Sequence, residues 1–336
     1  MHLSLFHSPA YIYCKSEENS HLASKSSHLI DGRARYRHAA VYASGKLWLV
    51  GGRNVPEDAV IGEVDVYDPA TNTWSTPGSI PNTRLTSDNG AFTNADESLV
   101  YVVGGYNPFY SNPDALTNLF TIDVARALDT DSPSILIGDK RQLQTQRGDI
   151  HAVSDAKGKK AYVTGGFSMY PCSPLKSVEV YDIEADTWSF TGELQSARGD
   201  KALVELQDKI YAIGGETSHE DQCSENPDDV PPLSAQSVAV DDVEVLHPNK
   251  GKWTVVASIP NFRFRFSAAS DPTTGKIYTF GGQDAFDADC SCFPTSDTVV
   301  VYQVGKGGSS SGMAVKGTAS IVLGALVGFA FVLIGM

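Results

Sequence analysis

A short apolar run that ends in two glycines occurs five times along the chain. Recurrence at a similar interval is typical of repeat architectures, in which each repeat is one supersecondary unit. The second glycines lie 53, 61, 49 and 67 residues apart, which fits a blade of four short strands with loops of variable length. The runs are LWLVGG at 47–52, VYVVGG at 100–105, AYVTGG at 161–166, IYAIGG at 210–215 and KIYTFGG at 276–282.

Units one and three repeat at more than the glycines. Tyr67 and Trp74 lie 15 and 22 residues after the second glycine of unit one, and Tyr181 and Trp188 keep the same distances in unit three. The segments between are short, rich in β-branched and aromatic residues and bounded by turn residues, which predicts strands. A glycine pair suits the end of an inner strand, where backbones crowd and positive φ is useful. The large rings are expected to fill the space between blades.

These residues resemble the kelch repeat over about residues 33–303. The resemblance implies an all-β fold, a kelch-type β-propeller of five to six four-stranded blades. Unit four separates its glycines from its tryptophan by a long insertion, and units two and five have no tryptophan. The repeat positions that carry the resemblance are Gly51, Gly52, Gly104, Gly105, Gly165, Gly166, Gly214, Gly215, Gly281, Gly282, Tyr67, Trp74, Tyr181, Trp188 and Trp253.

Closure of the ring is incomplete in the sequence. Unit five supplies three strand-like segments, whereas residues 1–32 align with the outer half of unit one, with Tyr13 over Tyr67. Either residues 1–32 donate the outer strand that completes unit five, or the chain is an N-terminally incomplete version of a six-bladed ring. An unclosed propeller would expose sheet edges, which proteins normally protect. We therefore expect a propeller over residues 33–304 and a closing strand or outer half-blade before it.

Composition limits the class of partner. At 41% hydrophobic and 20% charged residues, the chain has the composition of a folded domain. Its formal net charge of -14 argues against general nucleic-acid binding, because neutralising phosphates requires a basic surface. The predicted partner is a protein or an acidic or carbohydrate ligand, without a cofactor.

The C-terminus predicts membrane attachment. Residues 305–316 form a Gly/Ser-rich linker. Residues 317–336 are apolar and end the chain without a following charge, close to the roughly 20 residues that a spanning helix needs. Three meanings stay open: a GPI-attachment signal, a tail anchor that leaves the propeller in the cytosol, and a single span with an extracellular propeller. We expect the cell surface, with a cytosol-facing tail-anchored form as the alternative.

The N-terminus disagrees with secretion. Residues 1–20 lack a basic n-region, and His7 and Pro9 interrupt their apolar runs, so they make a weak signal peptide. A missing N-terminal part would explain both this weakness and the half-blade.

Four of the five cysteines lie in loops that follow a glycine pair. Core cysteines that act as small hydrophobes would lie in strands, so these positions favour disulfides in an oxidising compartment. The odd total leaves one cysteine without a partner in this chain. A Cys-x-Cys pair alone is too sparse for zinc, which takes about four ligands. The candidate disulfide residues are Cys172, Cys223, Cys290 and Cys292.

Arginines recur in the segment that leads into each unit's first strand. In a four-stranded antiparallel blade, this segment and the loop after the glycine pair emerge on the same face. Guanidinium groups suit carboxylates, sulfates and phosphates, and in propellers that resemble this one they can line a pocket for acidic peptides or sugars. The alternative is structural pairing with acidic residues of neighbouring blades. The candidate ligand-binding residues are Arg35, Arg84, Arg147, Arg198 and Arg263, with Arg33, Arg37 and Arg265 in the same segments.

Enzymatic activity has little support in the sequence. Some kelch-like propellers resemble galactose oxidase or are sugar mutarotases, but His38 and His151 hold matching repeat positions and are expected to be structural. The chain has no nucleophile elbow and no phosphate loop. Two Arg-Gly-Asp tripeptides, at 147–149 and 198–200, coincide with the repeat, and the acidic loop at 284–289 is expected to be solvated. We expect a recognition or scaffold module without catalytic or metal-binding residues. The alternatives are a carbohydrate-active enzyme and a cytosolic adaptor.

Overall fold

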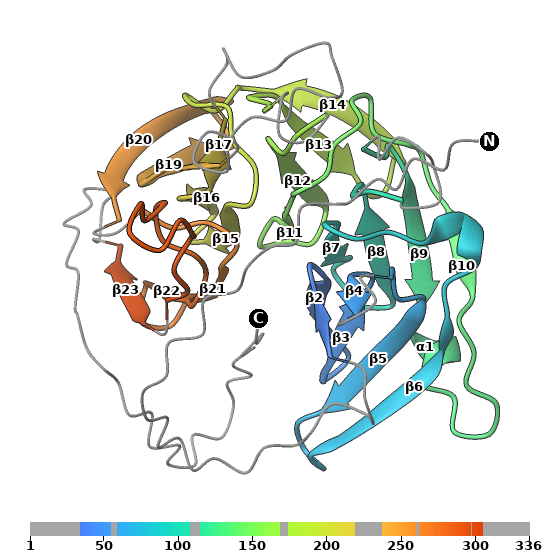
Figure 1. Cartoon of the computed structure of the whole chain (residues 1–336). Helices are drawn as coiled ribbons and strands as arrows, with labels where there is room; N and C mark the ends of the chain where they lie inside the picture. The colour runs from blue at the N-terminus through green and yellow to red at the C-terminus, as the bar shows by residue number, and fades with distance from the viewer. Residues whose placement is uncertain are drawn as a thin grey trace, which may run out of the picture.

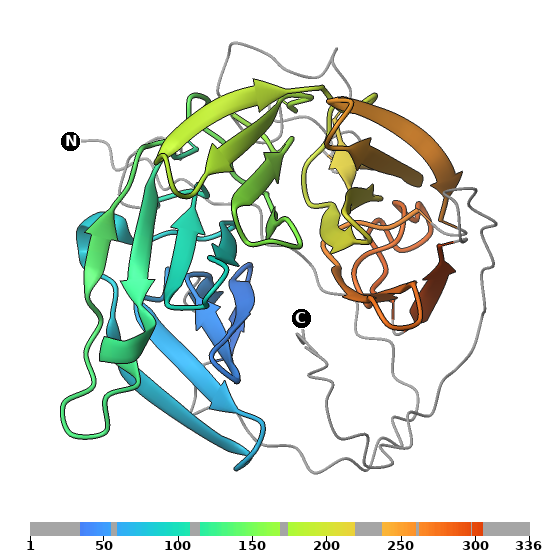
Figure 2. The same cartoon turned by 180° about the vertical axis from the view of Figure 1, so that it is seen from behind.

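A computed structural model of the chain shows five consecutive antiparallel sheets, or blades, each with its strands in sequence order (Figure 1). Blades 1 to 4 have four strands and blade 5 has three. Both views place the blades side by side along an arc, with blades 1 and 5 at its ends and the first strand of each blade innermost (Figures 1 and 2). The structure describes residues 34–54, 59–107, 115–168, 174–218, 237–259, 262–296 and 298–304.

The blades follow the five repeats that the glycine pairs define. Two small two-stranded sheets, β1 with β4 and β17 with β18, lie beside blades 1 and 4. Blade 1 consists of β2 (Ala39–Ala43), β3 (Lys46–Val50), β5 (Glu63–Asp68) and β6 (Thr73–Ser79), and blade 2 of β7 (Gly90–Thr93), β8 (Leu99–Val103), β9 (Leu119–Asp123) and β10 (Ile137–Asp139). Blade 3 consists of β11 (Ala152–Ser154), β12 (Lys160–Thr164), β13 (Val178–Asp182) and β14 (Thr187–Thr191), and blade 4 of β15 (Ala202–Leu206), β16 (Lys209–Ile213), β19 (Asp242–His247) and β20 (Lys252–Ser258). Blade 5 consists of β21 (Ser267–Asp271), β22 (Lys276–Phe280) and β23 (Val299–Gln303), and the strands outside the main sheets are β1 (Arg35–Tyr36), β4 (Arg53–Asn54), β17 (Glu216–Thr217) and β18 (Val238–Ala239).

Each glycine pair ends the second strand of a blade, and the pairs of blades 1 to 4 also bind the next blade. In blade 3, Gly165 and Gly166 have φ of +54° and +88°, and the Gly166 N–H donates to the Arg198 carbonyl at 2.9 Å. A Cβ on Gly165 would lie 2.3 Å from that carbonyl oxygen, closer than any real Cβ contact. The same N–H links join Gly52 to Thr86, Gly105 to Arg147 and Gly215 to Arg263, at 3.1, 2.9 and 2.8 Å. Glycine is therefore required twice, for positive φ and for the approach of two backbones.

Aromatic side chains pack between blades, where the sequence places them. Tyr181 of blade 3 is fully buried, and its ring centroid lies 6.0 Å from that of Tyr101 and 6.2 Å from that of Phe92, both in blade 2. Trp188 pairs with Tyr181 across β13 and β14 and donates its Nε1–H to the Arg141 carbonyl at 2.7 Å. These contacts hold blade 3 against blade 2.

Blade 2 is complete although its repeat lacks the tryptophan. After β9 the chain makes one helical turn, α1 (Val124–Ala127), before β10. The Asp123 side chain caps this turn by accepting from the Arg126 N–H at 2.9 Å. Val124 and Ala127 are buried with Trp48 of blade 1 in one apolar cluster. A helical turn thus supplies apolar contact that a tryptophan would otherwise provide.

The predicted blade number is refined to five in the described part of the chain. There, β23 pairs only with β22, so blade 5 lacks a fourth strand. The closing segment predicted at 1–32 and the hydrophobic helix predicted at 317–336 lie outside the described residues. Within the ranges that the structure describes, no helix has the length and apolarity needed to cross a membrane.

We expect Gly166→Ala to destabilise the propeller far more than Gly251→Ala. A Cβ at 166 would lie 2.4 Å from the Gly148 carbonyl oxygen, whereas at Gly251, which also has positive φ, the nearest atom is 3.6 Å away. The left-handed conformation alone costs about 1–2 kcal/mol, so Gly251→Ala should cost about that much. Urea unfolding measures both variants. Equal losses would show that the close approach of the Gly166 and Gly148 backbones contributes little.

Candidate functional site

The arginine that precedes blade 3 is buried, and both of its Nη atoms are hydrogen-bonded. Arg147 donates from Nη1 to the Gly165 and Ser177 carbonyls at 2.8 and 3.0 Å, and from Nη2 to the Glu179 carboxylate at 2.8 Å. Both side chains of the ion pair are fully buried. Glu179 also accepts the backbone N–H groups of Gln144 and Thr145, at 2.7 and 3.1 Å. A buried ion pair needs such additional hydrogen bonds to offset the loss of hydration.

Blades 1 and 4 repeat this arrangement. Arg35 contacts Asp65 at 2.5 Å and donates to the Gly51 carbonyl at 3.1 Å, and Arg198 contacts Glu244 at 3.0 Å. Each acid is the second residue of a Val-acid-Val run on the third strand of its blade. Blade 5 has no acid at this place, and the described contacts of Arg263 include the hydroxyls of Ser296 and Thr298 at 2.8 and 2.6 Å.

Blade 2 replaces both partners together. Thr86 takes the arginine position, because the Gly52 N–H donates to its carbonyl as other second glycines donate to Arg147, Arg198 and Arg263. Phe120 takes the acid position, because it pairs with Val102 as Glu179 pairs with Val163. Phe120 is fully buried and the Thr86 hydroxyl donates to the Gly104 carbonyl at 2.7 Å. Blade 2 thus has uncharged residues at both positions.

The predicted ligand-binding arginines fall into two groups. Arg35, Arg147, Arg198 and Arg263 are at most 3% exposed and bond inside their own blades. Arg84 lies two residues before Thr86, with a side chain 30% exposed, and contacts Asp139 at 2.6 Å. Arg35, Arg147 and Arg198 each contact a buried carboxylate, whereas Arg263 lies 3.9 Å from the partly exposed Asp284. The ligand role of all four stays a prediction. The two Arg-Gly-Asp tripeptides are buried with them.

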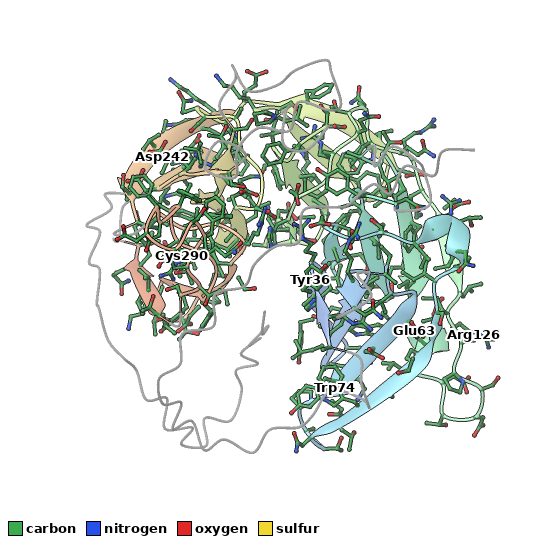
Figure 3. All side chains as sticks on the ribbon, viewed as in Figure 1. Tyr36, Glu63, Trp74, Arg126, Asp242 and Cys290 are labelled. Carbon is green, nitrogen blue, oxygen red and sulfur yellow. A yellow bond between two sulfur atoms is a disulfide. The ribbon has the colours of Figure 1, made fainter. Side chains whose placement is uncertain are left out.

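Two positions after each buried position lies a second layer of charged residues, here called the inner ring. All five members have positive φ, between 46° and 57°, a conformation that is uncommon outside glycine. Tyr36, which precedes the first of them, lies at the inner end of blade 1 in Figure 3. The inner ring consists of Arg37, Asp88, Asp149, Asp200 and Arg265.

Backbone and side-chain bonds connect the inner ring across blades. The N–H groups of Asp88, Asp200 and Arg265 donate to the carbonyls of Arg37, Asp149 and Asp200, at 2.8, 2.9 and 2.9 Å. Arg37 contacts Asp88 at 2.9 Å and reaches Asp149 of blade 3 at 3.9 Å. The ring therefore joins blade 1 to blades 2 and 3 by charge as well as by backbone.

Arg265 bridges two acids of blade 4. It contacts Asp200 and Glu216 at 2.9 Å each and donates to the Gln283 side chain at 3.1 Å. Burial raises the pKa of Glu216 to about 8, although Arg265 opposes the shift. Burial opposes the charge of Asp200, but Arg265, the hydrogen bond with Glu216 and the charge of Arg37 together lower the pKa of Asp200. Arg265 therefore favours the charged form of Asp200 while Glu216 keeps its proton at neutral pH.

Asp149 lies in the least hydrated part of the inner ring. Burial is the main cause that raises the pKa of the Asp149 carboxyl well above its usual range, and the negative charges of Asp200 and Asp88 add to it. The Tyr106 hydroxyl donates to its Oδ2 at 2.9 Å, and the pKa of that tyrosine is also raised, mainly by burial. The two histidines at matching repeat positions are half-buried, and the loss of hydration at their rings lowers the pKa of His38 to about 3 and that of His151 below its usual value.

The structure pairs two of the candidate cysteines. Cys290 and Cys292 form a disulfide in the loop between β22 and β23, whereas Cys172 and Cys223 lie outside the described residues. In the part of the chain that is described, no group of three or more His, Cys, Asp or Glu residues is placed to hold a metal ion.

The acids of this site were missed in the sequence, although a signal existed. Asp65, Glu179 and Glu244 recur between two valines on strands that otherwise read as buried. A charge at a core position requires a partner, and the arginine at the start of the same unit was the available one.

Comparison with known proteins gives the family. Residues 13–223 match the KLHDC2/KLHL20/DRC7 Kelch-repeats domain family, and residues 197–260 match the Kelch motif. Because the first match spans more than half of the chain, the chain belongs to this family of kelch-repeat domains. The kelch repeat predicted from the glycine pairs is confirmed.

The most informative relatives are longer proteins. The chain is similar to Kelch-like protein 36 of Bos taurus, with 27% identity over 282 residues, which cover 83% of this chain and 40% of that protein. It is also similar to Kelch-like protein 23 of Homo sapiens, with 23% identity over 223 residues, 66% of this chain and 34% of that protein. This chain thus spans less than half the length of these relatives. A solved structure described as "Structure of YjhT" shares the fold, with a TM-score of 0.63, 15% identity and coverage of 82% of this chain and 84% of that one.

We expect Arg147→Ala to destabilise the fold by about 3–5 kcal/mol, because it leaves Glu179 buried without its partner. The double variant Arg147→Thr/Glu179→Phe copies the natural pair Thr86 and Phe120 of blade 2 and should recover part of that loss. Chemical denaturation measures both. If Arg147→Ala keeps wild-type stability, the ion pair does not stabilise blade 3.

The raised pKa of Glu216 predicts that its contribution to the stability of the fold decreases as the pH rises. Its folded pKa of about 8 exceeds the reference value of 4.5, so the folded state binds the extra proton between these values. The stabilisation of the fold by this proton is complete below the reference pKa and is lost as the pH rises through the folded pKa. The free energy of unfolding then falls by no more than about 1.4 kcal/mol per pH unit. Glu216→Gln cannot lose this proton.

The test is the difference in unfolding free energy between Glu216→Gln and wild type, measured at several pH values across that window. Titrating groups that do not interact with Glu216 cancel in this difference, including His38 and His151, whose lowered pKa values act in the opposite direction. The difference should move in favour of the glutamine variant as the pH rises. A constant difference would mean that Glu216 titrates normally.

Proposed function

We propose that this chain is a recognition module that binds a protein partner on the face formed by the glycine-pair loops and the inner ring. The observation that carries the proposal is the inner ring itself, five charged residues held in an uncommon backbone conformation at the innermost end of every blade. The likeness to Kelch-like proteins supports a protein partner over a nucleic acid, as does the net charge of -14.

The exposed part of the inner ring favours an acidic segment of the partner. The Arg37 side chain is 23% exposed, whereas those of Asp88 and Asp149 are 2% and 1% exposed. The arginine therefore lies toward solvent and the acids lie beneath it. A guanidinium has five N–H groups in a planar fork and can contact more than one carboxylate.

The charge balance of this region supports the same partner. The inner ring, together with Arg53 and Glu216 after the glycine pairs of blades 1 and 4, holds three arginines and four carboxyl groups. Glu216 is neutral at pH 7 because its pKa is about 8, which leaves three charges of each sign. The raised pKa of Asp149 shifts the balance further toward positive.

We expect Arg37→Ala to weaken binding to Asp/Glu-rich peptides by about tenfold, the loss of one charge-assisted contact worth about 1.4 kcal/mol. The probes are a set of acidic peptides and Lys/Arg-rich peptides of equal length, titrated by fluorescence anisotropy. Binding to the acidic set should weaken as salt screens the charges.

The matched control is Lys46→Ala. Lys46 is also partly exposed and also contacts a carboxylate, Asp68 at 2.6 Å, but it lies at the opposite end of its blade from the glycine pair. It should leave peptide binding unchanged. A preference for basic peptides, or an equal loss in both variants, would contradict the proposed face.

Membrane attachment and a cell-surface location stay predictions that rest on residues 305–336. Release of the protein from intact cells by a phosphatidylinositol-specific phospholipase would support the GPI-anchored form. Retention, together with protection from added protease, would support the cytosol-facing form. The carbohydrate-active alternative is tested by turnover of a sugar anomer and by metal analysis of the purified chain.

A further inference from the structure

The loop between β22 and β23 is folded by its backbone around two cysteines. The Asp287 N–H donates to the Cys292 carbonyl at 2.9 Å, and the Cys292 N–H donates to the Asp287 carbonyl at 3.2 Å. Ser291, between the cysteines, has a φ of +51°. Cys290 and Cys292 are joined by a disulfide with a Cα–Cα distance of 5.3 Å. The loop is thus held by hydrogen bonds that do not depend on the sulfur–sulfur bond.

Aromatic contacts hold the same loop against blade 5. The Phe293 ring packs edge-on against Phe264 and Phe286, with centroid distances of 5.2 and 5.4 Å. Phe264 lies between Arg263 and the inner-ring residue Arg265, so the loop is anchored next to the inner ring. This packing fixes Cys292, the neighbour of Phe293, in the interior.

The two sulfur-bearing residues differ in access. Cys290 is exposed, whereas Cys292 is 1% exposed. Figure 3 labels Cys290 in blade 5. An external nucleophile therefore reaches the sulfur of Cys290 and displaces that of Cys292. Accessible disulfides are the ones that exchange with thiols.

The disulfide adds little to the stability of the chain. A cross-link restricts the unfolded chain less as the loop that it closes becomes shorter, and here one residue separates the cysteines. Because backbone hydrogen bonds and the packing of Phe293 already fix the loop, the disulfide contributes little to its conformation. The reactivity of the disulfide toward thiols is therefore more informative about its role than its effect on stability.

The surroundings of Cys290 are acidic. Asp287 and Asp289 are exposed and lie within three residues of it, and the Asp287 carbonyl oxygen is 3.7 Å from its sulfur. The Asp289 N–H donates to the Asp287 carboxylate at 2.8 Å, which orients that charge in the loop. Negative charge repels an anionic thiol and attracts a cationic one, over about 10 Å at 0.1 M salt.

We propose that Cys290–Cys292 is a thiol–disulfide exchange site that selects thiols of positive charge. In the first step a substrate thiolate attacks the Cys290 sulfur. A bond forms between those two sulfurs, the Cys290–Cys292 bond breaks, and Cys292 leaves as a thiolate that takes a proton from water. A second substrate thiolate then attacks the substrate sulfur of the mixed disulfide and releases Cys290 as a thiolate, which is protonated. Two thiols are oxidised to one disulfide while the protein disulfide is reduced by two electrons.

The selectivity is tested on the full chain with three small thiols: cysteamine, which is cationic, 2-mercaptoethanol, which is neutral, and 2-mercaptoethanesulfonate, which is anionic. Each is supplied at the same thiolate concentration, and the reaction is stopped with acid. Mass spectrometry of the tryptic peptide between Lys276 and Lys306 follows the two cysteines apart from the others. We expect rates in the order cationic, neutral, anionic, over a range of about tenfold at low salt, and convergence at high salt. The reverse order, or equal rates, would overturn the proposal.

Three variants test the roles of individual residues. When given cystamine, the disulfide of cysteamine, Cys292→Ser should form a mixed disulfide on Cys290 and release one cysteamine, whereas in Cys290→Ser the remaining Cys292 should react slowly. Asp287→Asn/Asp289→Asn should remove the preference for cysteamine while leaving the rate with 2-mercaptoethanol nearly unchanged.

Thermal unfolding separates an exchange site from a structural cross-link. Reduction of Cys290–Cys292 should leave the Tm of the propeller nearly unchanged. A large drop in Tm on reduction, or equal reactivity of Cys290 and Cys292, would show instead that the disulfide is structural. None of these readouts depends on the acidic partner proposed for the inner ring, so either proposal can fail alone.

Discussion

The fold depends on one backbone hydrogen bond that recurs between blades. The second glycine of each pair in blades 1 to 4 donates its N–H to the carbonyl of the residue that leads into the next blade. That residue is Arg147, Arg198 or Arg263 in three cases and Thr86 in one. The bond ends a strand, joins two blades and fixes where the following side chain enters. Because an inner-ring residue follows two positions after each fixed residue, the bond that assembles the blades positions the candidate binding face as well.

Burial of an arginine at this junction is stable only when its own blade supplies acceptors. Arg147 has them in Glu179, Ser177 and the Gly165 carbonyl. Blade 2 shows the other solution, with Thr86 and Phe120 in the two places. An apolar pair of similar fit is often as stable as a buried ion pair, so the two solutions are interchangeable within one ring. The partly exposed arginines of this region are then Arg37 and Arg265, each two residues after a buried arginine.

The sequence predicts the blades well because glycine pairs are local signals. The phase of the repeat and the shared face of arginines and loops follow from five such pairs, and the structure agrees. The pairing of Arg147 with Glu179 is different, because 32 residues separate them and only the register of β12 with β13 brings them together. The α1 turn that completes blade 2 was not predicted either, because its packing also depends on residues far apart in the sequence. The exposure of Arg37 was also missed, because it depends on how blades 1 to 3 meet at the inner ring.

Amide hydrogen exchange tests most directly whether the glycine-pair bond holds the blades together. The N–H groups of Gly105, Gly166 and Gly215 should exchange only through global unfolding, with protection equal to that of the central strands β8, β12 and β16. Fast exchange at Gly166, or protection of Gly166 well below that of β12, would contradict this account.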